Sequence, residues 1–195
     1  LRHAPPVTAN LVNYLWPLFI VVLAPLFVRD LRFSLVHVGA ALVGFAGAAL
    51  AIVADRGGAD ATSGEFPWGY LAALASAWVW ASYSLLTKRV AHFPTAAIGL
   101  FGLVSGGLSL LCHLWLEPTV SLTGRDWGLL VLLGLGPLGA AFFLWDAALK
   151  RGDPRRIGVL SYFTPPASTV LLTLSCGRPL PAALGIASLV IVGAA

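Results

Sequence analysis

Apolar stretches of about the length that crosses a bilayer follow one another along the whole chain. The hydrocarbon core of a membrane is about 30 Å thick, and a helix needs roughly 20 apolar residues to span it. Because 58% of the residues are hydrophobic and only 10% are charged, a water-soluble domain of this size could not cover so much apolar surface. The sequence therefore predicts an all-α transmembrane protein, with helices at residues 9–28, 33–53, 67–86, 95–116, 127–149, 157–176 and 181–195.

Lysine and arginine are distributed unevenly between the two sides of these predicted helices. Eight lie on one side and four on the other, and cytoplasmic loops of membrane proteins carry the excess. The richer side, with the loops at residues 29–32, 88–92 and 150–156, is predicted to be cytoplasmic. The net charge of +4 is then explained by the lysine and arginine of the cytoplasmic loops, and no nucleic-acid partner is expected. Ten arginines against two lysines are typical of a GC-rich bacterial gene, so we expect a bacterial inner membrane.

Two segments that are 148 positions apart resemble each other. The segment LRHAPPVTANLVNYLWP, residues 1–17, aligns with LKRGDPRRIGVLSYFTP, residues 149–165. A Tyr-x-x-Pro motif falls in register, so that Tyr14 matches Tyr162 and Pro17 matches Pro165. A pattern of small residues repeats in the following helices, at a shift of 146. Secondary transporters are commonly built from such internal repeats, so we predict one here.

The repeat predicts helices that the printed sequence does not contain. Three predicted helices precede the Tyr-x-x-Pro helix of the second copy, whereas none precedes that of the first. We therefore expect about 80 residues before Leu1, and an inverted-repeat (5+5) transporter fold of ten helices, of which about seven are present. Residues 1–54 would be the last two helices of the first repeat. Residues 67–195 would be the second repeat, with its last helix truncated; the absence of methionine and the 15-residue final stretch agree with this.

The two Tyr-x-x-Pro helices each carry one polar stripe near their middle. At 100° per residue, Asn13 and Tyr14 share one face of the first helix, and Ser161 and Tyr162 share one face of the second. An amide exposed to lipid costs several kcal/mol, so these faces should meet protein or a water-filled cavity. A simpler alternative is that the polar atoms only bond to neighbouring groups, as membrane helices tolerate such residues.

Prolines inside these helices remove a backbone hydrogen bond and clash with the preceding turn. We expect bends or gates at Pro17, Pro137 and Pro165. Two bent helices related by symmetry would leave a gap between them, and we predict the substrate cavity there.

The helix at residues 67–86 contributes aromatic side chains that lie too deep for the membrane interface. Trp80 and Tyr83 share one side of it, and Trp78 lies on the other. Such rings can line a cavity and stack on an aromatic or apolar solute, although plain packing is an equal alternative for either tryptophan.

Two titratable groups lie within predicted helices. Asp146 is the only acid well inside one, and an intramembrane carboxylate is a functional hypothesis by default. An ion pair with Lys150, one turn away, is slightly favoured over a coupling role. His113 is either a proton site or an ordinary interfacial histidine, and the second is favoured.

The sequence shows no arrangement of residues that indicates catalysis, metal binding or a cofactor. It lacks a Ser/His/Asp set and a metal-ligand cluster, and its glycines are spaced for helix packing. We therefore expect neither an enzyme nor a bound cofactor.

NYLWP, followed by RDLRF and GALVGFAGAAL, resembles the EamA-type members of the drug/metabolite transporter superfamily. SYFTP, with the upstream LKRGDPRRIGVL, is similar to the YddG-like exporters of aromatic amino acids within it. The resemblance covers essentially the whole chain. It implies an inner-membrane transporter that moves small metabolites outward by alternating access through an aromatic-lined cavity. Carried onto the matching motifs, it places these residues beside the cavity or at its bends: Asn13, Tyr14, Trp16, Pro17, Ser161, Tyr162 and Pro165.

Three functions are compatible with the sequence. The first is export of aromatic or other apolar amino acids, with a small amino-acid-like solute and the lipid bilayer as the partners. The second is efflux of cationic drugs or other metabolites, with Asp146 as the counter-charge. The third is a membrane scaffold or receptor without transport, which would not explain the repeat. The coupling ion and the oligomeric state are left open by the sequence.

Overall fold

The computed structural model describes residues 6–29, 31–55, 68–90, 93–118 and 120–175, together with Ile186 and Leu189. Within these ranges the chain is helical and contains no β-strand, which confirms the predicted all-α class. The predicted last helix, at residues 181–195, lies outside the described residues except for Ile186 and Leu189, which are helical. The helices are α1 (Pro6–Asn13), α2 (Trp16–Phe27), α3 (Leu35–Asp55), α4 (Trp68–Leu86), α5 (Ala97–Leu116), α6 (Gly124–Leu135), the π-helical turn η1 (Gly136–Ala140), α7 (Ala141–Arg151), α8 (Pro154–Ser161) and α9 (Thr164–Ser175).

Three segments of this helical chain are long and apolar enough to cross a membrane, judged by length and composition. They are Ala9–Phe27, Ala97–Leu116 and Gly124–Arg151. A shorter apolar segment runs along α3, at Leu35–Leu50. The first and third of the long segments each contain more than one helical element. The first consists of α1 and α2, and the third consists of α6, η1 and α7.

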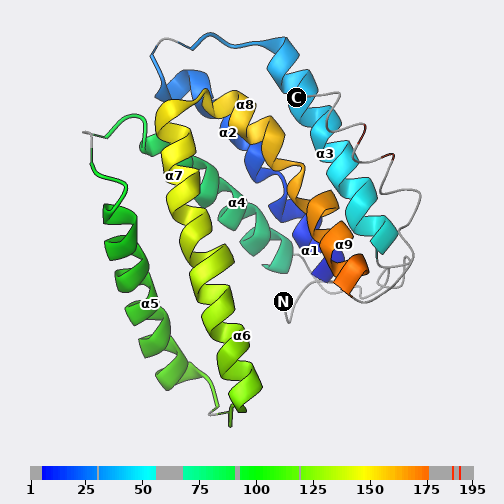
Figure 1. Cartoon of the computed structure of the whole chain (residues 1–195). Coiled ribbons are helices and arrows are strands. Elements are labelled where there is room, and N and C mark those ends of the chain that lie inside the picture. Colours follow the sequence, from blue (N-terminus) through cyan, green and yellow to red (C-terminus); the bar gives the residue numbers. More distant parts are fainter. Residues whose placement is uncertain are drawn as a thin grey trace. The chain divides into compact units, whose positions relative to one another are not determined.

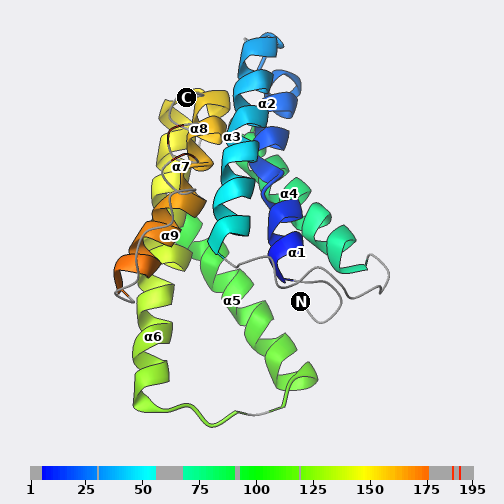
Figure 2. The same ribbon diagram turned by 90° about the vertical axis from the view of Figure 1, so that its right-hand side faces the viewer.

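The chain folds into two compact units. The first unit contains Leu1–Arg89 and Gly152–Ala195, and the second contains Val90–Arg151. In the first unit α2 packs against α3, α4 and α8 (Figure 1), and Figure 2 shows α2 between α3 and α4. Its core is a cluster of buried side chains that draws on the first and last thirds of the sequence: Val21, Ala41, Ala48, Val159 and Tyr162.

In the second unit α5 packs against α7, and α6 leads through η1 into α7. α6 begins with a capping box, in which the Thr123 side chain accepts from the Asp126 backbone N–H and Asp126 accepts from the Thr123 backbone N–H. This reciprocal pair satisfies two first-turn donors and fixes where the helix starts.

Both helices with a Tyr-x-x-Pro motif are interrupted at equivalent positions. The turn Tyr14–Leu15 separates α1 from α2, and the turn Tyr162–Phe163 separates α8 from α9. In each turn the N–H that follows the tyrosine donates three residues back. Leu15 N donates to Val12 O at 3.2 Å, and Phe163 N donates to Leu160 O at 3.0 Å. Donor and acceptor are shifted by 148 positions in both cases, as the sequence repeat predicts.

The proline of each motif explains where its helix is interrupted. Pro17 and Pro165 are the second residues of α2 and α9. The N–H groups of a first helical turn have no acceptor within the helix, so a proline without an N–H costs no hydrogen bond there. Their rings would clash with the turn before them if the helix continued. Each helix therefore stops before its proline and a new helix starts there.

At Pro137, where the sequence predicts a bend or gate, the structure has the π-helical turn η1. Pro137 cannot donate a backbone hydrogen bond, and a π turn is a common way to absorb such a defect within a helix. Gly139 permits the wider turn, since a Cβ at this position would overlap the carbonyl oxygen of Gly134.

Candidate functional site

Three aromatic rings from α2 and α4 form a continuous cluster in the first unit. Trp16 is the first residue of α2, and its ring meets Trp80 edge to face, with centroids 6.2 Å apart and an interplanar angle of 88°. Trp80 in turn lies 5.5 Å from Tyr83, with the rings tilted by 35°. The cluster therefore starts at the interruption between α1 and α2 and extends along α4.

A second aromatic pair joins the same two helices. Phe19 of α2 meets Trp78 of α4 with centroids 5.8 Å apart and an interplanar angle of 70°. Trp78 is 51% exposed, whereas Trp80 is largely covered. The structure thus brings both α4 tryptophans to α2, although sequence spacing placed them on different sides of the helix. Phe19 was not predicted; its spacing of three from Trp16, which puts both on one helical face, was the available signal.

The polar side chains of the two stripes are bonded to nearby groups. Asn13 Nδ2 donates to Ser76 Oγ at 3.2 Å and to the Ala73 carbonyl at 3.5 Å, both on α4. Ser161 Oγ donates to the Ile157 carbonyl of its own helix at 2.7 Å. These bonds fit the simpler of the two alternatives for the stripes, and they show Asn13 fixing α1 against α4.

The two motif tyrosines have different surroundings despite their equivalent positions. Tyr162 is completely buried, while Tyr14 is half-buried. Tyr162 lies on the bare backbone of α3, since a Cβ at Gly44 would be 2.5 Å from Tyr162 Cδ2. Its ring also meets Phe45, with centroids 6.3 Å apart.

The interrupted helices contact each other next to Pro17. Pro17 and Pro165 are both buried. Gly158 of α8 faces the Pro17 carbonyl so closely that a Cβ at Gly158 would lie 3.1 Å from this oxygen. The close contact of Gly158 with α2 was not predicted, because the pairing of α8 with α2 cannot be read from the pattern of a single helix.

Asp146 forms the predicted ion pair within the second unit. Only 1% of the residue is exposed, and its Oδ2 lies 2.6 Å from Lys150 Nζ. Lys150 also donates to the Phe93 carbonyl at 2.8 Å and to Thr95 Oγ1 at 3.4 Å, with its ammonium 3.9 Å from the Phe93 ring centroid. The lysine thus connects the end of α7 to the chain just before α5, and the charge of Asp146 is already compensated.

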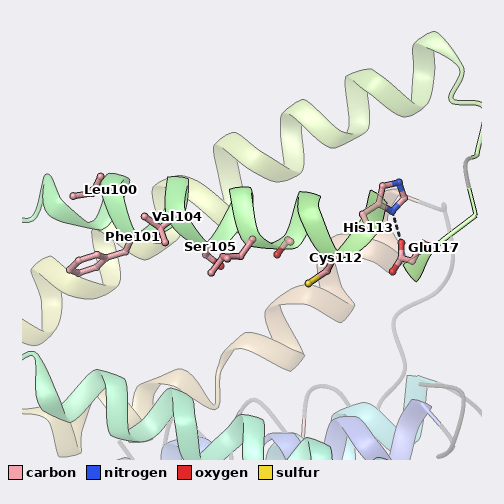
Figure 3. A pocket seen from close by; sticks show the side chains of 9 residues that line it. Leu100, Phe101, Val104, Ser105, Cys112, His113 and Glu117 are labelled. Carbon is pink, nitrogen blue, oxygen red and sulfur yellow. Dashed lines mark hydrogen bonds and ion pairs between the residues drawn. The ribbon is translucent and has the colours of Figure 1, made fainter. Parts of the chain in front are cut away.

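His113 pairs with Glu117 at the end of α5. The Nδ1 to Oε2 distance is 2.6 Å, and both side chains are substantially exposed. They border a hollow of about 760 Å³ (Figure 3). All the side chains that line the hollow come from α5 and the residue after it: Leu100, Phe101, Val104, Ser105, Leu108, Ser109, Cys112, His113 and Glu117. Solute sites gather polar groups from several elements, so this one-sided hollow is a weak candidate for a substrate site.

Within the described ranges no three His, Cys, Asp or Glu side chains are grouped so that they could hold a metal ion.

The comparisons with known proteins identify the family. The model of the EamA-like transporter family matches residues 67–195. The chain belongs to the EamA-like transporter family. Its membership confirms the resemblance inferred from NYLWP and SYFTP, and makes the chain a multi-pass membrane protein of a transporter family.

Three curated relatives of this EamA-like transporter are each named as an aromatic amino acid exporter YddG. The relative from Ancylobacter novellus is 44% identical over all of this chain and 67% of its own length. The relatives from Escherichia coli and Salmonella typhimurium are 27% and 28% identical, over 91% and 92% of this chain and 61% of their own lengths. A crystal structure with 42% identity has a TM-score of 0.89 and covers all of this chain, which spans 66% of that chain. The EamA-like chain thus spans about two thirds of the proteins it matches.

Proposed function

We propose that the protein exports aromatic or other apolar amino acids across a bacterial inner membrane by alternating access. The observation that carries this proposal is the ring cluster of Trp16, Trp80 and Tyr83 at the interruption between α1 and α2. The three curated relatives, each named as an aromatic amino acid exporter, support the same substrate class.

The ring cluster can recognise an aromatic side chain by its chemistry. Aromatic pairs prefer edge-to-face or offset arrangements with centroids 4.5–7 Å apart, and each pair contributes roughly 0.5–1.5 kcal/mol beyond its area. Trp16 is the anchor of the proposed cavity, with Trp78, Trp80 and Tyr83 as its α4 wall. Tyr14 and Ser161 form the facing part, Tyr162 supports it as a completely buried side chain, and Asn13 fixes α1 to α4.

Interrupted helices provide the backbone chemistry that a zwitterionic solute needs. The N–H groups of a helix start and the carbonyls of a helix end lack intrahelical partners, and transporters use such groups to bind charged substrate atoms. The interruptions at Tyr14–Leu15 and Tyr162–Phe163 offer chiefly carbonyl groups for this role, because Pro17, Pro165 and Pro166 have no backbone N–H. Pro17, Pro165 and the π turn around Pro137 are the proposed flexible points during alternating access.

The proposed architecture is an inverted repeat of five plus five helices. Residues 1–54 belong to the first repeat and residues 67–195 to the second. The shared backbone hydrogen bonds after Tyr14 and Tyr162 support this assignment. Loops 29–32, 88–92 and 150–156 are proposed to face the cytoplasm, because they carry most of the lysine and arginine.

The proposal is tested with the protein as its gene encodes it, reconstituted in liposomes loaded with a panel of amino acids. Efflux of tryptophan and phenylalanine should exceed efflux of charged amino acids. Trp16→Ala should raise the KM for tryptophan by about two- to tenfold, as expected for the loss of one or two ring contacts. Trp115→Ala is the matched control, because Trp115 is 86% exposed on α5.

Equal tryptophan efflux by the Trp16→Ala protein and the unaltered protein would exclude Trp16 from the cavity. Efflux of none of the panel by the unaltered protein would contradict the proposed function itself and favour the scaffold or receptor hypothesis.

A further inference from the structure

Asn13 uses only the donor side of its amide in its contacts with α4. Its Nδ2 donates to Ser76 Oγ at 3.2 Å and to the Ala73 carbonyl at 3.5 Å, so both donor contacts are made to one helix. Within the described residues its Oδ1 accepts no hydrogen bond. The half-buried side chain of Asn13 therefore retains an acceptor oxygen beside the interruption between α1 and α2.

The backbone of Asn13 provides a second acceptor. Asn13 is the last residue of α1 and lies four residues before Pro17. Proline has no N–H, so the Asn13 carbonyl lacks the hydrogen bond that it would accept in a continuous helix. An ammonium group has donors only, and carbonyl oxygens are suitable partners for it. Asn13 thus supplies two oxygens that could bind an ammonium group.

Ser76 supplies the complementary donor. Its oxygen accepts from Asn13, and its hydroxyl donates to no group within the described part of the chain. Ser84 on the same helix instead donates to the Trp80 carbonyl, one turn back, at 2.8 Å. Ser76 is exposed, and a hydroxyl that accepts one hydrogen bond becomes a stronger donor. Its O–H is therefore available to a group that has acceptors only, such as a carboxylate.

The Asn13–Ser76 pair lies one helical turn from the ring contact between Trp16 and Trp80. Ser76 and Trp80 are four residues apart, which places them on one face of α4, about 6 Å apart along its axis. Asn13 and Trp16 are three residues apart on the other side of the contact. An aromatic amino acid carries its charged groups a single methylene group away from its ring. Such a solute can therefore reach the rings and the pair at the same time.

We propose that Asn13 and Ser76 bind the charged groups of the amino acid whose side chain lies against the ring cluster. The Ser76 hydroxyl donates to the α-carboxylate, and the Oδ1 and backbone oxygens of Asn13 accept from the α-ammonium. The pair thus selects amino acids, and the rings select aromatic ones among them. The inference rests on the proposed function, because it takes the ring cluster as the site of the solute's side chain.

The test uses two analogues of tryptophan that each lack one charged group. Tryptamine keeps the ammonium, and indole-3-propionate keeps the carboxylate. Each should displace radiolabelled tryptophan from the purified protein as its gene encodes it, but less well than tryptophan does, because each keeps one of the two polar contacts. An analogue that displaces no tryptophan, or that binds as well as tryptophan, would overturn the inference.

Ser76→Ala removes the proposed carboxylate donor. The dissociation constants of tryptophan and indole-3-propionate should rise about tenfold or more, as expected for the loss of a hydrogen bond to a charged group, whereas that of tryptamine should stay within about twofold. Ser82→Ala is the matched control, because it makes the same change on another face of α4 and should leave all three constants unaltered. A role of Ser76 in packing alone would weaken all three ligands alike, and this result would overturn the inference.

Asn13→Asp changes the hydrogen bonding of the pair in a predictable direction. A carboxylate has acceptors only, so it binds an ammonium more strongly than an amide does and draws the Ser76 hydroxyl to itself. Tryptamine should therefore bind about tenfold more tightly, and indole-3-propionate should bind about tenfold more weakly. Shifts in the same direction for the two analogues would contradict the proposed roles.

Efflux from liposomes separates this inference from the proposed function. The expected binding pattern without efflux of any amino acid by the unaltered protein would support the Asn13–Ser76 site and refute export. Tryptophan efflux that is unaltered in both Ser76→Ala and Asn13→Asp would refute the site and leave the proposed function standing.

Discussion

The Pro17 carbonyl of α2 faces Gly158 of α8, and a Cβ at Gly158 would lie 3.1 Å from this oxygen. The same Cβ would lie 3.3 Å from Val21 Cγ2 and 3.4 Å from Ile20 Cγ2. The contact joins the two interrupted helices next to one of the interruptions. A side chain at this position would press on the carbonyl oxygen, so Gly158 allows α8 to pack closely against α2.

Gly158→Ala should therefore destabilise the protein. The added methyl group meets a backbone carbonyl, which cannot rotate away, and overpacking of this kind costs about 1–3 kcal/mol. The expected result is a lower midpoint of thermal unfolding in detergent, with a larger fall for Gly158→Leu.

Gly39→Ala is the control, because no atom lies within 4 Å of a Cβ at Gly39 in α3. Alanine is favoured over glycine inside a helix, so this variant should unfold at an equal or higher temperature. Equal midpoints for Gly158→Ala and the unaltered protein would show that the two helices separate without cost.

The helices and their interruptions could be predicted because they depend on local properties. Apolar length predicted the segments, and Pro17 and Pro165 predicted where two of them are disturbed. The partner of each face could not be predicted in the same way. A helical wheel shows the face of the helix on which Asn13 lies. It does not show that Ser76 is the hydrogen-bond partner, because the partner depends on how α1 is placed along α4.

The candidate site was predictable only in part, for a related reason. Trp16 and Trp80 were both chosen from their sequence context, but their edge-to-face contact depends on the packing of α2 against α4. Helical periodicity predicted that Trp78 and Trp80 lie on different sides of α4, and yet Trp78 also contacts α2, through the ring of Phe19. The π turn at Pro137 was also beyond pattern analysis, because a proline signals a defect and not the geometry that absorbs it.

Asp146 and Lys150 provide a test of the ion pair in the second unit. Removing one partner of a buried pair costs about 3–5 kcal/mol, since the other charge is left without compensation. Asp146→Asn should therefore lower the unfolding midpoint, as should Lys150→Met. The double variant Asp146→Leu with Lys150→Met should be more stable than either single charge removal.

The same variants separate a structural role of Asp146 from a role in ion coupling. In protein that remains folded, Asp146→Asn should leave tryptophan efflux within about twofold of the unaltered value, as the carboxylate is already paired with Lys150. Complete loss of efflux by folded Asp146→Asn protein would instead support ion coupling at this residue.

Asp153, in the loop before α8, should make the stability of the folded state depend on pH. Burial opposes the charge of this carboxylate, but hydrogen bonds from the Arg155 side chain and backbone, and the charges of Arg155 and His37, hold the pKa of Asp153 below its ordinary value of 3.8. A carboxylate with a lowered pKa stabilises the folded state above its unfolded pKa, and this stabilisation is lost as the pH falls through the folded pKa.

The unfolding midpoint should therefore contain a contribution from Asp153 at neutral pH that declines as the pH falls below about 4. Arg155 donates to both Asp153 oxygens and to the Arg32 carbonyl, so Arg155→Gln should lower the midpoint at neutral pH. The difference between this variant and the unaltered protein should shrink as the solution is acidified. A difference that is constant from neutral pH to about pH 3 would contradict the assigned pKa direction.

Trp16 is the position next to the two interruptions at which an aromatic side chain stands in one helix and a small polar one in the other. The repeat aligns Trp16 with Thr164. Trp16 is the first residue of α2 and Thr164 is the first residue of α9, each directly after an interruption. If Trp16 recognises aromatic side chains, Trp16→Thr should make the two helix starts alike and remove the aromatic preference. The ratio of tryptophan to alanine efflux should fall about two- to tenfold, with alanine efflux largely retained. Trp127→Thr makes the same change at an exposed residue of α6 and should preserve the ratio, whereas a preserved ratio in Trp16→Thr would place substrate choice elsewhere.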